Sequence, residues 1–554
     1  MQITQPDVLL QSSSLCGRCG RTVSATYSSC PWCGILQPSL PLALELPGCF
    51  QPARVSIAAL RQSRIPITET TYLALGGGLG SFAWVDYLRV CGAATAQIAV
   101  IGHESAPYAR FQRLCRYSQI FDEERIRSDS GAMPDNLWGW PGYAVREIID
   151  LLRHNQWGEA GRIAWQIFSE PALAHTYAPR AQAVCLALER EMKRIGWRHM
   201  LRQGKVCAVR QTDDGRYAVL YVPTGTGPGR SPQFLIAPYL QLALGYPGLH
   251  LAAETHIYRR TYRDSRLVVQ AYENHEHVYE ELARRGGMLI LRGRGIVASR
   301  ILQRLDEIRQ ATGQAIRVIH LLRYPLAGDT FYGRARRQAQ HHRHLQPFNW
   351  PKAAFGGDLR FILEKATPAE RQALFANWGG TTTSDRRDWQ EVVVRGQREG
   401  WYNLYLGTIE HIKPNGRNRL VVRIQDFAPP RACNRLVVDF VLDCTGLNAR
   451  LTDHPILADL SHRYGLRPNA GGGLVVTPDF ELKELRNGYG QVFMAGTMAF
   501  GNAFAPVDSF LGLQYAAQRS VDVLIRENAP GLRPLNGLQS LRQWWRWLRG
   551  FDPS

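Results

Sequence analysis

The sequence predicts an α/β protein built around two similar units, each consisting of a short apolar strand, a glycine-rich turn and a helix. The two units begin near residues 70 and 287. The composition is that of a folded chain, because 45% of the residues are hydrophobic and only 20% are charged. These values exclude a disordered, collagen-like or coiled-coil chain. A length of 554 residues suggests about three or four domains.

The first module contains two cysteine pairs, Cys16 with Cys19 and Cys30 with Cys33, and a glycine follows each pair. Two intervening residues let one tight turn present both thiolates to a single ion. Four thiolates favour tetrahedral Zn²⁺ and leave no open position for catalysis. The pattern resembles the short zinc ribbons at the ends of many larger proteins. We therefore predict a zinc ribbon and linker at residues 1–50, with unligated or redox-active cysteines as the alternative.

The first glycine-rich turn follows the apolar run 70–75. It contains Gly76, Gly78, Gly80 and, in the position of a third motif glycine, Ser81. A helical stretch and a second apolar run follow. This order is typical of a dinucleotide-binding unit, in which glycines let the backbone approach a pyrophosphate at the helix N-terminus. A glycine-rich turn in an ordinary α/β domain would have the same pattern, so support is needed from elsewhere in the chain.

The acidic residue expected after the second strand of such a unit is displaced to Glu104. A carboxylate there is suited to bind a ribose hydroxyl of the dinucleotide. We therefore include Glu104 among the candidate cofactor-binding residues.

The second glycine-rich turn contains Gly293, Gly295 and Ala298 and follows the apolar run 287–291. The next predicted strand ends at Arg323. An acidic residue at that place would bind the ribose of NAD, whereas an arginine accommodates the additional phosphate of NADP. The sequence therefore favours NADP, and a solvated basic loop is the alternative explanation for the arginine.

Two later segments support the first assignment. The apolar run 436–442 leads to Thr445 and Gly446, and a second apolar strand leads to Gly496 and Thr497. In this order, with a hinge at 234–247, the segments resemble those of flavoproteins with two dinucleotide-binding domains, in particular the N-hydroxylating flavin monooxygenases.

The resemblance implies two Rossmann-like domains, one for FAD and one for NADP. It places the FAD-binding domain at residues 66–250 and 436–530, and the NADP-binding domain at 251–435. It also makes Asn502 and Asp508 candidates for facing the flavin. The cofactor-binding candidates are Gly76, Gly78, Gly80, Ser81, Glu104, Gly293, Gly295, Ala298, Arg323, Thr445, Gly446, Gly496 and Thr497.

The tail at residues 531–554 is rich in Trp and Arg. On a helix, Leu538, Leu541, Trp545 and Leu548 share one face. Trp and Arg on an amphipathic helix suit an anionic membrane surface or a protein partner, and docking on the protein's own core is the alternative. The formal net charge of +19 agrees with anionic partners, but no aromatic-basic face indicates nucleic acid.

No signal-like N-terminus or long apolar run is evident, so we expect a cytoplasmic protein, with peripheral membrane association through the tail as a further possibility. The histidine-rich run 338–344 reads as a helix with a basic surface, because adjacent histidines on a helix point to different faces. The expected function is an FAD-dependent NADPH oxidoreductase, resembling a monooxygenase, that passes hydride from NADPH to flavin and on to O₂ or another acceptor, with a small-molecule substrate. The alternative is a flavoprotein-like scaffold that senses redox state or assembles partners.

Overall fold

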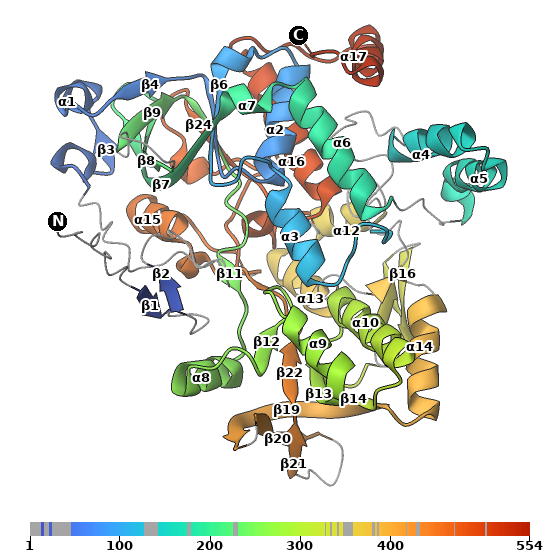
Figure 1. Ribbon diagram of the computed structural model, residues 1–554. Coiled ribbons are helices and arrows are strands. Elements are labelled where there is room, and N and C mark those ends of the chain that lie inside the picture. Colours follow the sequence, from blue (N-terminus) through green and yellow to red (C-terminus); the bar gives the residue numbers. More distant parts are fainter. Residues whose placement is uncertain are drawn as a thin grey trace, which may run out of the picture. The chain divides into compact units, whose positions relative to one another are not determined.

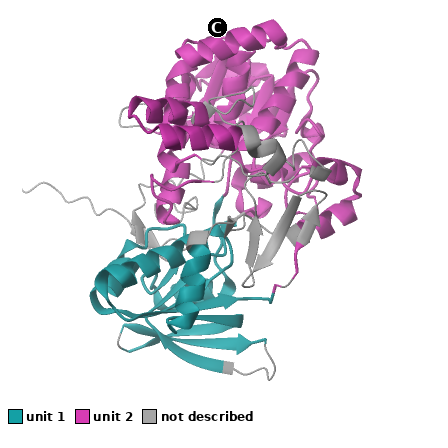
Figure 2. Cartoon of the chain, turned by 90° about the vertical axis from the view of Figure 1, so that its right-hand side faces the viewer, with its two compact units in different colours: residues 1–45, 247–325, 386–448 teal, residues 46–246, 326–385, 449–554 magenta. Residues whose placement is uncertain are grey.

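The computed structural model describes most of the chain in two compact units. Unit 1 comprises residues 1–45, 247–325 and 386–448, and unit 2 comprises residues 46–246, 326–385 and 449–554 (Figure 2). The described residues are 13–15, 22–24, 46–126, 142–173, 179–224, 231–326, 328–332, 335–340, 343–346, 358–378, 383–384, 387–416, 418–427, 433–469, 471–504 and 507–553.

Unit 2 is built on one large sheet (Figure 1). Its first five strands run parallel, and the long strand β7 then turns into an antiparallel meander. In sheet order the strands are β24 (Gln491–Met494), β10 (Tyr239–Leu242), β5 (Tyr72–Leu75), β6 (Ile98–Gly102), β7 (Leu201–Thr212), β8 (Tyr217–Pro223), β9 (Gln233–Ala237) and β4 (Ile67–Glu69), with β3 (Arg54–Val55) beside β7.

Unit 1 has a sheet of the same kind. Five parallel strands are followed by an antiparallel meander that begins in the long strand β19. In sheet order the strands are β12 (Val268–Gln270), β22 (Phe440–Asp443), β13 (Gly287–Arg292), β14 (Ile316–Leu322), β19 (Tyr402–Asn415), β20 (Arg419–Asp426) and β21 (Cys433–Val438).

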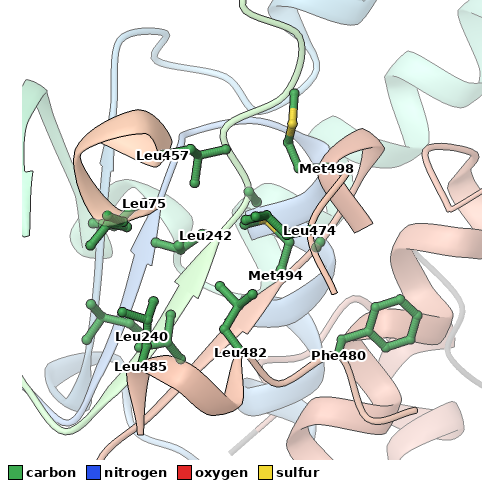
Figure 3. Packing of buried hydrophobic residues seen from close by; sticks show 14 of the residues in the cluster. Leu75, Leu240, Leu242, Leu457, Leu474, Phe480, Leu482, Leu485, Met494 and Met498 are labelled. Atoms are coloured by element: carbon green, nitrogen blue, oxygen red, sulfur yellow. The ribbon is translucent and has the colours of Figure 1, made fainter. Parts of the chain in front are cut away.

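The parallel strands of unit 2 are buried along their whole length, as expected when both faces of a sheet are covered. Alternate residues of β5 enter two different cores, Tyr72 on one face and Leu75 on the other. Leu75, Leu242 and Met494 project from neighbouring strands into the second of these cores (Figure 3). The first core includes α2 (Leu79–Val90) and α16 (Phe510–Arg526), which pack against each other.

The remaining helices and short strands lie outside these two sheets. In unit 2 they are α1 (Ile57–Gln62), α3 (Ala109–Tyr117), α4 (Gly142–Arg153), α5 (Trp157–Leu173), α6 (Ala181–Arg194), α7 (Trp197–Met200), β15 (Thr330–Tyr332), β16 (Ala335–Gln340), β17 (Arg343–Gln346), α12 (Asp358–Lys365), α13 (Pro368–Trp378), β18 (Thr383–Ser384), α15 (Pro455–Tyr464) and α17 (Gly537–Arg549). In unit 1 they are β1 (Ser13–Leu15), β2 (Thr22–Ser24), β11 (Gly248–Leu249), α8 (Ala253–Tyr262), α9 (Glu276–Arg285), α10 (Ile296–Thr312), α14 (Arg387–Arg398) and β23 (Leu447–Asn448). Within the described ranges, no helix combines the length and apolarity needed to span a bilayer.

The structure divides the chain differently from the sequence-based domains in two places. The apolar run 436–442 is not one strand beside the flavin loop, because the chain breaks it at Asp439 into β21 and β22, and β22 pairs with β12 and β13 of unit 1. The last segment of unit 1 therefore ends after Asn448, whereas the sequence-based domain ended at residue 435. Residues 326–385, which were expected in the NADP-binding domain, belong to unit 2.

The expected helix at 338–344 is wrong. Its described residues lie in the antiparallel strands β16 and β17, where Ala339 is opposite His344. Pairing with a neighbouring strand, which a helix-period count does not register, decides the local structure.

Candidate functional site

In unit 2 the ends of four parallel strands meet at one edge of the sheet. Leu75 is paired with both Ile101 and Leu242, and Leu242 is paired with Met494. The residues that follow these strands therefore meet, and the Gly76 amide donates to the Ile101 carbonyl over 2.9 Å. Such an edge, where the strand order reverses around the first strand, is where open α/β sheets bind ligands.

The first glycine loop comes too close to its neighbours to carry side chains. A Cβ on Gly76 would lie 2.2 Å from the carbonyl oxygen of Ala243, and the Gly76 φ of +107° is itself unfavourable for other residues. A Cβ on Gly102 would lie 2.4 Å from the Cα of Gly77. Gly80 packs similarly, because its Cβ would lie 3.0 Å from the Cβ of Ala243. Gly76 and Gly102 are therefore required by the fold itself, and Gly80 allows close packing against Ala243.

Gly78 differs from these glycines, because the space that a side chain would occupy there is open. It caps the N-terminus of α2 with an ordinary φ of −96°, and no atom lies within 4 Å of where its Cβ would be. Three residues later, the Ser81 hydroxyl is fully buried without a hydrogen-bond partner within the chain. A helix N-terminus with open space before it and an unsatisfied hydroxyl beside it fits a phosphate-bearing cofactor. The residues present therefore fit the pyrophosphate of FAD.

Glu104 lies just beyond the carboxyl end of β6 and is half exposed. Its carboxylate accepts a hydrogen bond from Arg113 of α3 over 2.9 Å. A Cβ on Gly77 would lie 3.8 Å from the Glu104 carbonyl oxygen, which places this residue beside the glycine loop. The position agrees with a contact to the cofactor ribose, which stays a prediction.

The segment after β24 closes the same edge of unit 2. The Ala495 amide donates to the Leu242 carbonyl over 3.0 Å, and Gly496 follows with a φ of +82°. Thr497 then begins a short 3₁₀ turn. Leu513 of α16 links this segment to the glycine loop, since it lies within 3.4 Å of a Cβ on Gly80 and within 3.7 Å of one on Gly496.

The two catalytic candidates differ in their surroundings. Asn502 donates from its amide to the carbonyls of Leu474 and Ala499 over 2.8 and 2.9 Å, so both its N–H groups brace its own loop. Asp508 is exposed and accepts a hydrogen bond from the Tyr246 hydroxyl. The Asp508 carboxylate is therefore accessible at the surface, whereas the Asn502 amide is engaged within its loop. The catalytic role of Asp508 stays a prediction.

In unit 1 the second glycine loop repeats the contact of the first. A Cβ on Gly293, whose φ is +119°, would lie 2.9 Å from the carbonyl oxygen of Cys444 at the end of β22. Gly295 caps the N-terminus of α10, and Ala298 is fully buried behind it. Gly446 has a φ of +105° and no atom within 4 Å of a Cβ. This arrangement fits a second dinucleotide.

Thr445 and Gly446 therefore lie beside the second glycine loop, in unit 1, rather than on a strand of the flavin sheet. The Thr445 hydroxyl contacts the His250 ring over 3.0 Å, and the Gly446 carbonyl accepts from Gln270 over 2.7 Å. Buried Asp443 accepts the Thr445 amide over 2.9 Å and so shapes this turn. These partners from β12 and the β11 region were not apparent from sequence.

Arg323 follows the last residue of β14 and is exposed. Its guanidinium lies 5.8 Å from the centre of the Tyr324 ring. The place at the carboxyl end of the second strand is the one that distinguishes NADP from NAD in such folds. Its contact with a phosphate stays a prediction.

Sequence reasoning missed His320, a fully buried residue of β14. Its Nε2 lies 2.5 Å from the Gly293 carbonyl oxygen, and its Nδ1 lies 3.0 Å from the Tyr402 hydroxyl. Because a carbonyl only accepts, Nε2 carries the proton and Nδ1 accepts from Tyr402. The one available signal was a polar residue within an otherwise apolar strand.

The metal prediction falls outside the described residues, since Cys16, Cys19, Cys30 and Cys33 all lie there. Among the residues that the structure does describe, no cluster of three or more His, Cys, Asp or Glu side chains is arranged to hold a metal. The antiparallel strands β1 and β2 are described, with Leu15 paired with Thr22, and the first cysteine pair lies between these two strands in the sequence.

Solved structures share this architecture. The chain superposes on ornithine N-hydroxylase KtzI from Kutzneria sp. 744, in a structure with reduced FAD, NADP⁺ and L-ornithine, with a TM-score of 0.57 and 13% identity over 83% of this chain and 100% of that one. For the FAD-bound cadaverine monooxygenase DfoA of Erwinia amylovora the TM-score is 0.60, at 13% identity over 85% and 98%. The chain has the fold of these enzymes.

L-lysine 6-monooxygenase from Pseudomonas syringae is also similar, with a TM-score of 0.55 and 16% identity over 82% of this chain and 99% of that one. No family model and no curated protein matches the sequence. At such low identity the likeness establishes the fold and leaves the reaction to the residues of this chain.

Proposed function

We propose that this chain is an FAD-dependent, NADPH-using monooxygenase of the cytoplasm that hydroxylates a small amine. The observation that carries the proposal is the open space over Gly78 at the N-terminus of α2, beside the unpartnered Ser81 hydroxyl. The choice of a small amine is supported by the names of enzymes with a similar fold, which act on ornithine, cadaverine and lysine.

FAD would lie against the first glycine loop, with its pyrophosphate at Gly78 and Ser81 and its ribose near Glu104. Gly496 and Thr497 would close the site from the end of β24. NADPH would lie against the second loop, with its additional phosphate at Arg323 and with Gly295, Thr445 and Gly446 nearby. When bound, the two cofactors would supply hydride transfer from nicotinamide to flavin and the subsequent reduction of O₂.

The residues of the chain itself would bind and orient the cofactors. The α2 N-terminus directs backbone N–H groups and the positive end of the helix dipole at the pyrophosphate. In unit 1, His320 donates to the Gly293 carbonyl and so fixes the orientation of that peptide group in the loop. Tyr246 and Asp508 form a hydroxyl–carboxylate pair beyond the closing strand, at which a proton could be held.

The first test is the absorbance spectrum of the purified protein between 300 and 600 nm, before and after anaerobic addition of NADPH or NADH. We expect two flavin bands that bleach faster with NADPH, followed by amine-dependent O₂ consumption in air. A colourless protein that cannot be reconstituted with FAD would overturn the proposal and favour a scaffold that kept the fold without the cofactor.

Gly78→Ala sharpens this test, because its methyl group would meet no atom of the chain. We expect the FAD-free variant to melt at the same temperature as the FAD-free wild type and to bind FAD at least tenfold more weakly, since the methyl group would occupy the place of the pyrophosphate (about 1.4 kcal/mol per factor of ten). Unchanged FAD affinity would show that the cofactor does not use this loop. Asp508→Ala tests the catalytic candidate: unaltered flavin reduction and product formation would remove it.

We also propose that the four N-terminal cysteines bind one Zn²⁺. The support is the spacing Cys16–Cys19 and Cys30–Cys33 together with the β1–β2 hairpin that brackets the first pair in the chain. Metal analysis should give one zinc per chain, and a Cys16→Ser, Cys19→Ser double variant should lose it while retaining flavin. A metal-free wild-type protein would contradict this assignment.

A further inference from the structure

The C-terminal helix α17 is capped at both ends. The Asn536 side chain caps its N-terminus by accepting a hydrogen bond from the Gln539 amide over 2.9 Å, and the Gln539 side-chain oxygen accepts one from the Asn536 backbone amide. Gly550 ends the helix with a φ of +71°. Such caps stabilise both ends of a helix independently of what it packs against.

The helix is attached to unit 2 by one face only. Trp547 is 4% exposed, and the Arg146 guanidinium of α4 stacks 4.6 Å above its ring. Gln543 donates to the Val90 carbonyl over 3.2 Å. Beyond the helix, the Asp552 carboxylate accepts two hydrogen bonds of 2.8 Å from the buried Arg89. The docking alternative considered for the tail is therefore correct for this face.

The opposite face is the more apolar one, and it points to solvent. Leu538 is 81% exposed, Leu541 61%, Trp545 50% and Leu548 43%. At about 100° per residue these four side chains fall within an arc of about 80°. We call them the α17 stripe. An ordinary surface helix packs its more apolar face against the core. In α17 the less apolar face is packed and the more apolar face is exposed, which is typical of a binding surface.

The charges beside the α17 stripe have a single sign. Arg542 and Arg549 lie along one edge of it at about 100° per residue, and the Arg549 guanidinium lies 4.6 Å above the Trp545 ring. The helix contains no Asp or Glu, and the carboxylate of Asp552 just after it is bound to Arg89. The stripe is thus an apolar ridge with an uncompensated positive border, complementary to an anionic surface with an apolar interior.

We propose that the α17 stripe docks this protein onto an anionic lipid bilayer. Leu and Trp side chains would enter the interface while the two arginines along one edge of the stripe meet lipid phosphates, as on other amphipathic helices that lie in the membrane plane. The helix has 13 residues, too few to cross the bilayer, so it would lie along the surface. The net charge of +19 adds a long-range attraction. This inference does not depend on the proposed oxidoreductase activity.

The test is co-sedimentation of the full-length protein with vesicles of phosphatidylcholine, with and without phosphatidylserine. Binding should require phosphatidylserine and weaken as salt is raised. Leu541→Asp should bind at least about tenfold more weakly, because binding strength follows the apolar area that enters the interface. The matched control is Ile257→Asp on α8, since Ile257 is 62% exposed and receives the same new charge. This control should bind like the wild type.

Melting temperature and light scattering accompany each variant. Leu541→Asp should melt close to the wild type, because most of the Leu541 side chain is exposed. Wild-type protein that stays in solution with phosphatidylserine vesicles overturns the proposal, as does equal loss of binding in both variants. A wild-type dimer that Leu541→Asp converts to a monomer, without vesicle binding, would assign the stripe to a second copy of the chain instead.

Discussion

The two units of this protein share one hydrogen-bonding plan. Unit 2 has the order β24-β10-β5-β6-β7-β8-β9, and unit 1 has β12-β22-β13-β14-β19-β20-β21. In each, a long strand (β7 or β19) passes from parallel to antiparallel pairing, with a bulge at Val206/Ala208 in one and at Ile409/His411 in the other. In each, the meander's last strand runs directly into the strand beside the glycine loop.

The two glycine loops make the same contacts, and the units differ in the charged residue that follows the next strand. Gly76 lies against the carbonyl of Ala243, and Gly293 lies against that of Cys444, the residues that end equivalent strands. After the next strand, unit 2 presents an acid at Glu104, and unit 1 presents a base at Arg323. The backbone framework thus builds the same glycine loop twice, and the charged residue after the next strand differs in sign between the two units.

The largest effect should come from breaking both loops in the same way. Gly76→Ala forces a methyl group to 2.2 Å from a carbonyl oxygen, and Gly293→Ala forces one to 2.9 Å, both at a positive φ. Backbone strain alone costs about 1–3 kcal/mol, and the steric overlap adds to it. We expect Gly76→Ala to lose bound flavin and melt markedly earlier.

Gly293→Ala should keep the flavin absorbance and lose its reduction by NADPH. Calorimetry and absorbance of both variants check this comparison. Retention of flavin in Gly76→Ala would show that the two loops do not have the same role.

An acid-dependent loss of stability should fall on unit 2, where the pKa of His454 is lowered from 6.5 to about 4, chiefly by burial and to a lesser extent by the positive charge of nearby Arg110. Above pH 6.5 the ring is neutral whether the chain is folded or not. As pH falls from 6.5 toward 4, the unfolded chain binds a proton that the folded one does not, so stability decreases by at most about 3 kcal/mol.

Denaturant unfolding at pH 7 and pH 5 measures this decrease. In His454→Gln the decrease between the two pH values should be smaller, because the titrating ring is gone. An equal decrease in both proteins would exclude His454 as its source.

Cofactor choice should change at the end of β14. Arg323→Ala removes a charge-assisted contact worth about 1.5–3 kcal/mol, so KM for NADPH should rise about tenfold or more. KM for NADH should not change, because NADH lacks the phosphate. Arg317→Ala, at an exposed position of the same strand, is the control and should leave both values unchanged. Equal changes for NADPH and NADH in Arg323→Ala would favour the solvated-loop explanation.

The smallest effect should follow from Tyr402→Phe, which removes the hydroxyl that donates to His320 over 3.0 Å. A single neutral hydrogen bond contributes about 1 kcal/mol. Because His320 also holds the Gly293 carbonyl, NADPH affinity should fall severalfold while FAD content stays constant. Stopped-flow reduction at several NADPH concentrations separates this binding effect from the rate of the reduction itself.

Local patterns were sufficient where one segment decides its own conformation. The strand, turn and helix of each glycine unit were predicted from apolar runs and glycine spacing, and the structure confirms β5 with α2 and β13 with α10. The common face of the tail helix was also predicted, since Leu538, Leu541, Trp545 and Leu548 recur at helical spacing. The fold class therefore followed from short-range information.

Other features depended on partners distant in the chain. The run 436–442 has one continuous apolar pattern, yet Asp439 divides it between a meander strand and a parallel strand of unit 1. The histidine-rich run became a hairpin, and His320 acquired its role only through contacts with Gly293 and Tyr402.

The sequence by itself determined the two glycine loops, the acidic and basic residues beside them and the amphipathic tail, because propensity and spacing act within about twenty residues. Only the tertiary structure decided which strands surround each loop, that Thr445 and Gly446 belong to the second one, and that α17 docks by Trp547 with its apolar stripe outward. Strand pairing and helix docking are settled by the burial of surfaces far apart in the chain, and no local pattern records which distant surface will be the partner.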